Sequence, residues 1–251
     1  MSGHSKWATI KRKKGATDAA RGRLFTRLIK EITIAARSGG GNAEGNPRLR
    51  LAIQTAKANN MPADNIKRAI QKGTGELPGT TLEEVAYEGY GPGGVAILVD
   101  VVTDNSNRTV SEMRHVFSRN NGNLGQGGSV AWMFHKKGSL VLLKSRNSKS
   151  EDEIMDIILE AGADDMQTDG DEYTILTSPH AFEPVRKALE EKGAVIESAS
   201  LQMIPQNTVK VSGREAEQLL KLMEALEEHE DVQNVYANFD IDEKELASLH
   251  G

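Results

Sequence analysis

The spacing of the apolar residues changes at Pro78, and this change limits the chain to a helical region followed by a mixed region of strands and helices. Before Pro78 apolar side chains recur at every third or fourth position, which is the period of one helix face. The clearest run predicts a helix over residues 18–37. Its inward residues are Leu24, Leu28, Ile32 and Ala36. The pattern therefore predicts an α-helical N-terminal domain.

Start and stop signals divide this region into three helices. The Ser-Gly-Gly-Gly run at 38–41 ends the first helix, and the Asn-Pro pair at 46–47 supplies a cap and a first-turn proline for the second. The Met-Pro pair at 61–62 ends the second helix and starts a short third one, which Gly73 closes. Three helices in a small bundle are the simplest packing.

After Pro78 short β-branched or alternating runs replace the helical period. Strands are predicted at residues 95–102, 129–134, 140–143, 173–176, 199–204, 208–211 and 235–241. Helices are predicted between them, around the apolar positions 110–117, 154–161, 185–189 and 216–226. An Asp-Gly pair at 169–170 predicts the turn of a hairpin.

The order of these elements predicts an α+β fold. Residues 138–204 follow a βαββαβ order, and the flanking residues 95–134 and 207–241 together follow the same order with an interruption. We therefore expect an N-terminal helical bundle and two ferredoxin-like βαββαβ units, one inserted in the other. A simple tandem arrangement is the competing topology. The predicted domains are 1–78, a basic helical domain; 79–134 plus 207–251, a split α/β domain; and 135–206, an inserted α/β domain.

The net charge of −5 conceals a strong division of charge along the chain. Residues 1–78 contain 16 Lys and Arg against 5 Asp and Glu, a balance of +11. Residues 79–251 contain 15 against 31, a balance of −16. Such a division indicates a polyanionic partner for the N-terminal part.

Several functional classes have no support in the sequence. The chain has no cysteine, which excludes disulfides, thiol nucleophiles and cysteine-based zinc sites and is typical of a reducing compartment. The six histidines are scattered, so no metal site is expected. No apolar run could span a bilayer, and the N-terminus lacks the apolar core of a secretory signal, so we expect a cytoplasmic protein that binds no membrane.

The strongest functional signal is a cationic segment between residues 6 and 30, in which Asp18 is the only acid. Cations at this density neutralise backbone phosphates, and a tryptophan can stack on an unpaired base. We expect residues 1–16 to be an arm that an anionic partner orders. The predicted nucleic-acid-binding residues are Lys6, Trp7, Lys11, Arg12, Lys13, Lys14, Arg21, Arg23, Arg27 and Lys30.

Two alternatives remain open for this segment. It could be a solvated cationic helix face, with Trp7 packed on its own domain. Further cations either extend the patch or serve only surface solubility: Lys57, Lys67, Arg68 and Lys72. As a binding protein, the chain should lose nucleic-acid affinity and stay folded when Arg23, Arg27 and Lys30 become Glu.

Catalytic chemistry is not expected. The glycine-rich runs at 89–94 and 122–128 lack the Gly-Lys-Ser/Thr of a phosphate-binding loop, and turn formation is the favoured interpretation. The acids Glu88, Asp100 and Asp104 could in principle gather as metal ligands or as an acid-base pair. However, residues 104–107 are more simply a loop and helix cap, and the acidic run at 227–231 is predicted to be a solvated helix end. No nucleophile, base and orienting group assemble, so the chain is predicted not to be an enzyme.

Four segments together resemble the YebC/PmpR family, which also includes a mitochondrial translational activator of cytochrome oxidase. They are GHSKWATIKRKKGATDAARGRLFTRLIKEI (3–32), YEGYGPGGVA (87–96), TDNSNRT (103–109) and GNLGQGGSVAWMF (122–134). The resemblance spans essentially the whole chain. Because its first motif begins at Gly3, the basic N-terminus is not expected to be an organelle transit peptide.

The resemblance implies a three-domain cytoplasmic protein of helical and α/β build that regulates gene expression by binding nucleic acid. Members are described as DNA-binding transcriptional regulators, and others as ribosome-associated factors that help translation of proline-rich stretches. We place the DNA-binding transcriptional regulator first and the ribosome-associated RNA-binding translation factor as the alternative. No cofactor and no obligatory small molecule is expected, although a small-molecule sensor is a third possibility by analogy of fold.

Overall fold

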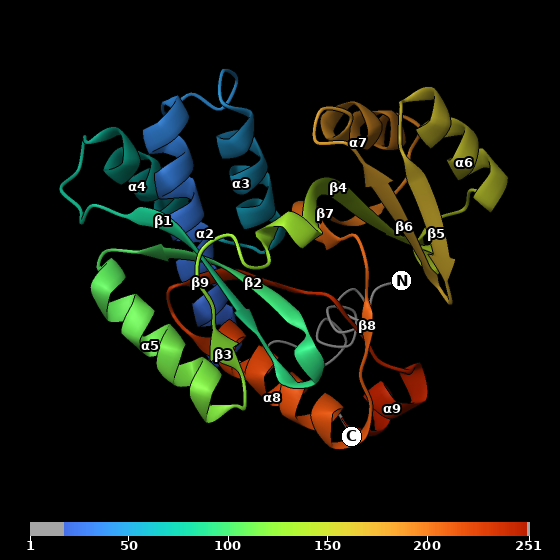
Figure 1. Ribbon diagram of the computed structural model, residues 1–251. Helices are drawn as coiled ribbons and strands as arrows, with labels where there is room; N and C mark the ends of the chain where they lie inside the picture. The colour runs from blue at the N-terminus through green and yellow to red at the C-terminus, as the bar shows by residue number, and fades with distance from the viewer. Residues whose placement is uncertain (1–17, 250–251) are drawn as a thin grey trace. The chain divides into compact units, whose positions relative to one another are not determined.

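The computed structural model describes residues 18–249 and shows an α+β protein (Figure 1). N-terminal helices precede two four-stranded antiparallel sheets that carry helices. Contacts divide the described chain into two units, one of residues 132–208 and one that combines the residues before 132 with those after 208. Within residues 18–249, no helix combines the length and apolar character needed to cross a bilayer.

The first helices form a bundle with its own core. Helix α2 spans Asp18–Gly39, α3 spans Pro47–Ala58 and α4 spans Ala63–Thr74, so the three predicted helices are confirmed. Their facing sides bury a continuous apolar cluster. Its fully or nearly fully buried members include Leu28, Ile32, Leu49, Ala56, Ile66 and Ala69.

Asn46 starts α3 as the sequence predicts and also fixes the end of α2. Its side-chain oxygen accepts a hydrogen bond from the backbone N–H of Leu49 at 3.1 Å. Its amide nitrogen donates to the carbonyls of Ala35 at 2.7 Å and Gly40 at 2.9 Å. The buried Asn46 amide therefore satisfies backbone groups at two helix ends.

Gly73 does not close α4, and this prediction is wrong. The helix continues to Thr74 and is capped by Gly75, which adopts the left-handed conformation at φ 82°. Gly73 instead lets α4 approach α2 closely. A Cβ atom at Gly73 would lie 2.4 Å from the carbonyl oxygen of Thr33 and 2.8 Å from the Cβ of Ala36.

The first sheet has the strand order β3-β1-β2-β9. Its strands are β1 Glu83–Tyr90, β2 Ala96–Thr103, β3 Asn123–Leu124 and β9 Val232–Ala237. Helices α5 Ser106–Arg119 and α8 Gly213–Glu228 lie on the same side of this sheet (Figure 1). Buried side chains of β2 and β9, such as Val99 and Val235, pack there against Met113, Phe117 and Leu219.

Smaller elements complete this unit. A short 3-10 helix η1 spans Pro92–Gly94 between β1 and β2. Strands β8 Val209–Lys210 and β10 Phe239–Asp240 form a separate parallel pair, and α9 Glu243–Ser248 follows.

One strand prediction for this half of the fold is wrong, and one strand was not predicted. Residues 83–90 form β1, for which the sequence predicts no strand. Residues 129–133 form a bend and the 3-10 helix η2 Ala131–Met133 instead of the predicted strand. The N–H groups of Val130 and Ala131 donate to the Glu88 carboxylate, so they cannot serve a strand ladder. Because β1 enters the sheet and β8 leaves it, the split half does not follow the predicted βαββαβ order.

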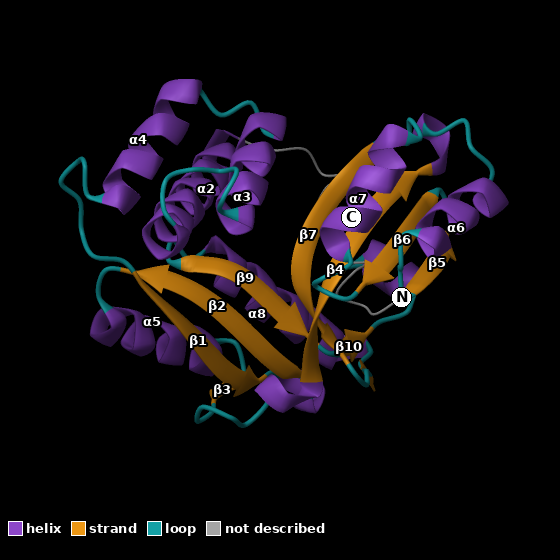
Figure 2. Cartoon of the chain, turned by 90° about the horizontal axis from the view of Figure 1, so that it is seen from above, coloured by secondary structure: helices purple, strands orange, loops and turns teal. Residues whose placement is uncertain are grey.

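The second unit follows the element order predicted for residues 138–204 (Figure 2). Its strands are β4 Phe134–Leu143, β5 Asp165–Asp169, β6 Glu172–Thr177 and β7 Ile196–Pro205, paired in the order β5-β6-β4-β7. Its helices are η3 Lys144–Arg146, α6 Glu151–Glu160 and α7 Phe182–Glu191. The hairpin turn at 169–170 is confirmed, since Asp169 pairs with Glu172 and Gly170 has φ 52°.

The close approach of α4 to α2 gives a first testable prediction. Gly73→Ala should lower the free energy of unfolding by about 2 kcal/mol, because the new methyl group meets a backbone carbonyl that cannot move freely. Gly22→Ala in α2 is the matched control, since nothing lies within 4 Å of its added Cβ. That variant should be stabilised by ~1 kcal/mol through helix propensity. Equal effects of the two changes in urea unfolding would contradict the proposed packing.

Candidate nucleic-acid interface

A buried carboxylate joins the basic helix α2 to the first sheet. Asp231 lies between α8 and β9, and its side chain is 4% exposed. Its Oδ1 accepts a hydrogen bond from Lys30 Nζ at 2.7 Å. Its Oδ2 accepts from Arg108 Nη2 at 2.8 Å, from Thr109 Oγ1 at 2.9 Å and from Thr103 Oγ1 at 3.2 Å.

These bonds decide the charge state of Asp231. Burial by itself raises the pKa of a carboxyl, but the hydrogen bonds from Lys30, Arg108 and Thr109 outweigh it. They hold the pKa of Asp231 well below its ordinary value. The carboxylate is therefore ionised, and both of its oxygens are satisfied inside the protein.

Lys30 belongs to the same group of contacts around Asp231, which we call the Asp231 junction. Its ammonium also donates to the carbonyls of Val102 and Glu230, each at 3.0 Å, so it has three partners for its three protons. The side chain is 16% exposed. The contacts connect α2 with the end of β2 and with the segment that leads into β9.

Two arginines extend the contact along α2. The Arg27 guanidinium donates to the carbonyl of Glu227, and burial lowers the pKa of Arg27. Arg23 Nη2 lies 3.6 Å from Glu228 Oε1, in a pair whose side chains are 38% and 57% exposed. Cations beside the last turn of α8 also interact favourably with its unpaired carbonyls. The predicted helix end at residues 227–231 is confirmed, because α8 ends at Glu228, but the run is only partly solvated, since Asp231 is buried.

The predicted interface residues now divide into three groups. Lys6, Trp7, Lys11, Arg12, Lys13 and Lys14 lie outside the described residues. Arg21 is exposed on the first turns of α2, and Arg23 is partly exposed in its pair with Glu228. Arg27 and Lys30 have structural partners within the chain. A nucleic-acid role for all ten residues stays a prediction.

The contacts of Arg23, Arg27 and Lys30 change the expectation that their triple glutamate variant stays folded. Glutamate at positions 23, 27 and 30 would face Glu228, the Glu227 carbonyl and the Asp231 carboxylate. We therefore expect the triple change to destabilise the fold, because it places like charges in a partly buried contact. It cannot serve as a clean test of binding.

The other cations of the helical bundle differ in whether they already have an acidic partner within the chain. Arg48 pairs with Glu31 at 2.8 Å and with Glu84 at 2.5 Å, and these bonds raise its pKa. Arg68 pairs with Asp64 at 3.0 Å. Lys57, Lys67 and Lys72 are exposed and have no bonded partner among residues 18–249.

The glycine-rich loop at 122–128 is held by a buried acid. Glu88, 7% exposed, accepts hydrogen bonds from the N–H groups of Gly128 at 2.6 Å, Val130 at 2.6 Å and Ala131 at 2.7 Å. Burial opposes ionisation, but these three bonds outweigh it and lower the pKa of Glu88. Because the N–H group of Gly128 and those of Val130 and Ala131 just after the loop bind a carboxylate of the chain itself, these three groups do not form a phosphate cradle.

The other acids singled out in the sequence have separate partners. Asp104 Oδ1 accepts from Arg108 at 3.2 Å on the surface. Asp100 on β2 bonds to Tyr236, whose pKa is raised by burial and by this carboxylate. Asn105 caps α5 by accepting from the Arg108 N–H at 3.0 Å, which confirms the predicted loop and cap. Glu88, Asp100 and Asp104 thus serve different local contacts.

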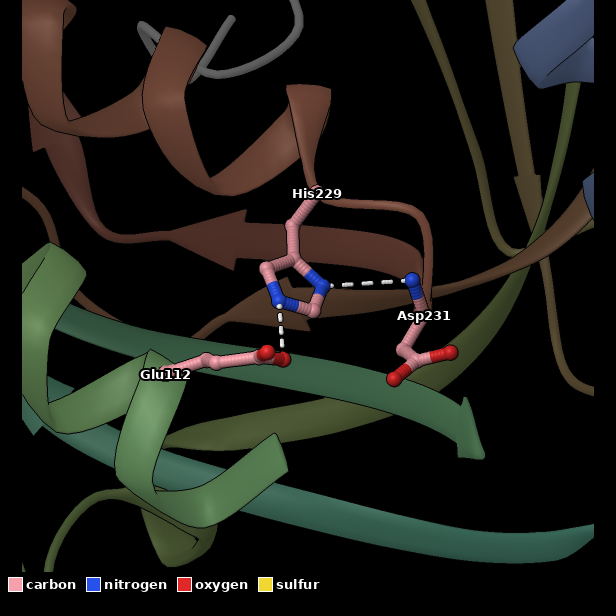
Figure 3. A group of neighbouring side chains, drawn as sticks. All are labelled: Glu112, His229 and Asp231. Atoms are coloured by element: carbon pink, nitrogen blue, oxygen red, sulfur yellow. Dashed lines mark hydrogen bonds and ion pairs between the residues drawn. The ribbon is translucent and has the colours of Figure 1, made fainter. Parts of the chain in front are cut away.

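One group of side chains has the composition of a metal site (Figure 3). Glu112, His229 and Asp231 each place a ligand atom within 4.8 Å of the others. However, His229 Nδ1 lies 3.2 Å from the Asp231 N–H, from which it accepts, so Nε2 carries the proton and donates to Glu112 Oε2 at 3.0 Å. Both Asp231 oxygens are already bonded. The group therefore acts as a support for the Lys30–Asp231 contact and does not fit a cation.

Sequence reasoning missed the Asp231 junction. Thr103, Arg108 and Thr109 were all in the TDNSNRT segment, but their shared partner lies more than 120 positions away. Periodicity and motif spacing carry no information about such a pair. The available signal was the acidic residue itself, directly before a buried strand.

The described residues thus define an α+β protein whose basic helical domain is bonded to an antiparallel sheet through a buried carboxylate. The profile described as the TACO1/YebC protein N-terminal domain matches residues 5–76, and that of the TACO1/YebC second and third domain matches residues 82–239. The chain belongs to the TACO1/YebC family.

Full-length relatives and a solved structure agree with this assignment. The chain is 59% identical over 251 residues to a probable transcriptional regulatory protein of Koribacter versatilis (strain Ellin345), covering 100% of both chains. It is 58% identical over 250 residues to one of Desulfotalea psychrophila, covering 99% of both. The crystal structure of a conserved hypothetical protein from Aquifex aeolicus superposes with a TM-score of 0.82 at 48% identity, covering 90% of this chain and 93% of that one.

The junction gives a second testable prediction. Asp231→Asn should lower the free energy of unfolding by about 3 kcal/mol, because it leaves Lys30 and Arg108 without a buried counter-charge. Asp104→Asn removes an exposed partner of the same Arg108 and should cost less than ~1 kcal/mol. Urea unfolding at neutral pH measures both.

The acid dependence of stability provides a further check on Asp231. Its folded pKa lies below its ordinary value of 3.8, so its contribution is complete above that pH and is lost as the pH falls below it. Wild-type stability should therefore decline more steeply below about pH 4 than that of Asp231→Asn. Parallel declines would show that the carboxylate does not stabilise the fold through its charge.

Proposed function

We propose that this protein is a non-enzymatic, cytoplasmic regulator of gene expression that binds nucleic acid, and that DNA is its first candidate partner in transcriptional regulation. The observation that carries the proposal is the cationic segment 6–30, with nine Lys and Arg and one acid. Such a segment provides the sequence-independent part of nucleic-acid affinity. The names of its full-length relatives support a role in transcription.

The cations of this segment are proposed to serve two roles, positioning α2 and contacting nucleic acid. Lys30 and Arg27 hold α2 against α8 and β9, so they position the segment and contribute little direct contact. The proposed contacts are Lys6, Trp7, Lys11, Arg12, Lys13, Lys14, Arg21 and Arg23. Arg23 can exchange Glu228 for a phosphate, because an exposed ion pair of this length contributes little stability.

Lysines of the neighbouring helices are proposed to extend the contact. Lys57, Lys67 and Lys72 are exposed cations of the same basic domain. The connection between α3 and α4 spans only residues 59–62, and α4 carries Lys67, Arg68 and Lys72 outside its buried side of Ile66 and Ala69. A polar cationic helix of this kind suits contact with a phosphate backbone.

The alternative partner is ribosomal RNA. In this version the protein is a ribosome-associated translation factor that relieves stalling on proline-rich stretches. The balance of −16 over residues 79–251 favours it, because an acidic body repels a duplex that would wrap around it. A basic N-terminal segment would then contact folded RNA alone.

The proposed regulator has a three-domain architecture. We propose that residues 135–206 form a ferredoxin-like domain inserted in a split domain of residues 79–134 and 207–251, after a helical domain of residues 1–78. The strand order β5-β6-β4-β7 supports this for the inserted part. The order β3-β1-β2-β9 gives the split part a different topology.

A salt titration tests the proposal. The variant Lys11→Gln/Arg12→Gln/Lys13→Gln/Lys14→Gln should bind duplex DNA and structured RNA more weakly and reduce the slope of log affinity against log salt by about 3 to 4. The matched control changes four exposed lysines of the acidic part: Lys187, Lys192, Lys210 and Lys221 to Gln. The control should keep the wild-type slope.

The same titration separates the two partners. Salt-resistant binding to purified ribosomes with only weak duplex binding would select the translation role. Tight duplex binding at physiological salt that improves on particular promoters would select transcription. Equal losses in both quadruple variants would show that net charge alone drives binding and would contradict the proposed interface.

A further inference from the structure

A second cationic segment lies within the otherwise acidic part of the chain. Residues 113–150 contain no Asp or Glu, although residues 79–251 contain 31 of them. Seven of the 15 Lys and Arg after residue 78 fall in this segment. They are Arg114, Arg119, Lys136, Lys137, Lys144, Arg146 and Lys149.

An exposed tryptophan lies in the same segment. Trp132 is 66% exposed, more than any other large apolar side chain of the described residues. Its backbone is fixed nevertheless, because Gln206 donates to the Trp132 carbonyl at 3.3 Å and to the Met133 carbonyl at 2.9 Å. The buried side chain of Phe134 follows at the start of β4. The indole is thus presented to solvent from a fixed backbone, as recognition residues are.

Of the cations of the second unit that lack a bonded partner among residues 18–249, Lys136 is nearest to Trp132 in the sequence, four positions later. Lys137 pairs with Asp164 at 2.7 Å, Arg146 pairs with Glu197 at 2.5 Å, and Lys144 lies 5.0 Å from the centre of the Tyr173 ring. Lys136 is exposed and has no bonded partner among the described residues. His135, also exposed, contacts Gln206 at 2.5 Å.

We propose that Trp132 is a second nucleic-acid contact, in which the indole stacks on an unpaired base and Lys136 binds a neighbouring phosphate. The inference rests on the proposed nucleic-acid function and adds a preference for unpaired strands, because the bases of a duplex already stack on one another. Lys136, exposed and unpaired among the described residues, lies four positions after Trp132 in a stretch of sequence without acids, and this favours a polyanion over a protein partner. The chemistry is shared by RNA and single-stranded DNA.

Tryptophan fluorescence tests the contact directly, since the chain has only two tryptophans. In a Trp7→Phe variant Trp132 is the only tryptophan, and selective excitation of tryptophan reports on it alone. Its emission should be quenched by single-stranded RNA or DNA oligonucleotides of about 12 nucleotides. The same duplex sequence should quench it less. Comparison of the RNA and DNA arms shows which strand the site prefers.

Affinity measurements on the full-length chain complete the test. Trp132→Ala should weaken single-strand binding by about tenfold, and Trp132→Phe should restore most of it. Lys136→Gln should reduce the salt slope by about 0.7. Leu159→Ala is the control, because Leu159 is an apolar side chain of the same unit that is 60% exposed. Thermal melting of each variant confirms that it is folded.

The outcomes separate this inference from the proposed function. If the chain binds single strands through Lys11 to Lys14 while Trp132 emission and Trp132→Ala affinity stay unchanged, the Trp132 contact is wrong and the proposed function stands. If the wild-type chain binds no nucleic acid, both are wrong. Quenching of Trp132 by a protein partner with none by oligonucleotides would also overturn the contact.

Discussion

The carboxylate of Asp231 is the interaction on which the arrangement of the larger unit depends. It bonds to Lys30 of α2, to Arg108 and Thr109 of α5 and to Thr103 at the end of β2, directly before its own strand β9 begins. Removing one partner of a buried ion pair strongly destabilises the folded protein, because the remaining charge is buried without compensation. The position of the basic helix relative to the sheet therefore depends strongly on this ionised group, and the contact of Arg27 with Glu227 supports the same arrangement.

The Asp231 junction and its neighbouring ion pairs reduce the positive charge that the N-terminal part can offer to a partner. Part of the positive excess of residues 1–78 is neutralised by the acidic part of the same chain, through Lys30, Arg27 and Arg23. The side chains proposed to bind an external polyanion are those before α2, Arg21 and the exposed lysines of α3 and α4. A basic surface inferred from sequence is thus divided between an internal contact and a proposed external one.

The local features of the fold could be predicted from sequence, and the non-local ones could not. Asn46 caps α3 and Gly170 turns a hairpin because both act on backbone groups a few residues away. Gly73 was misassigned because its constraint is the carbonyl of Thr33, 40 positions earlier in a neighbouring helix. The strand expected at 129–134 failed because Glu88 takes its N–H groups. Lys30 was assigned to phosphates because its partner lies 201 positions away.

The central claim is that the chain contacts nucleic acid through its N-terminal basic segment, and ultraviolet crosslinking in its native cells tests it most directly. Nucleic acid should be recovered with the chain, and the crosslinked peptides should fall between residues 6 and 30. The recovered species, DNA or ribosomal RNA, then identifies the partner. Recovery no greater than from the Lys11–Lys14 variant, or crosslinks confined to the acidic region after residue 150, would contradict the claim.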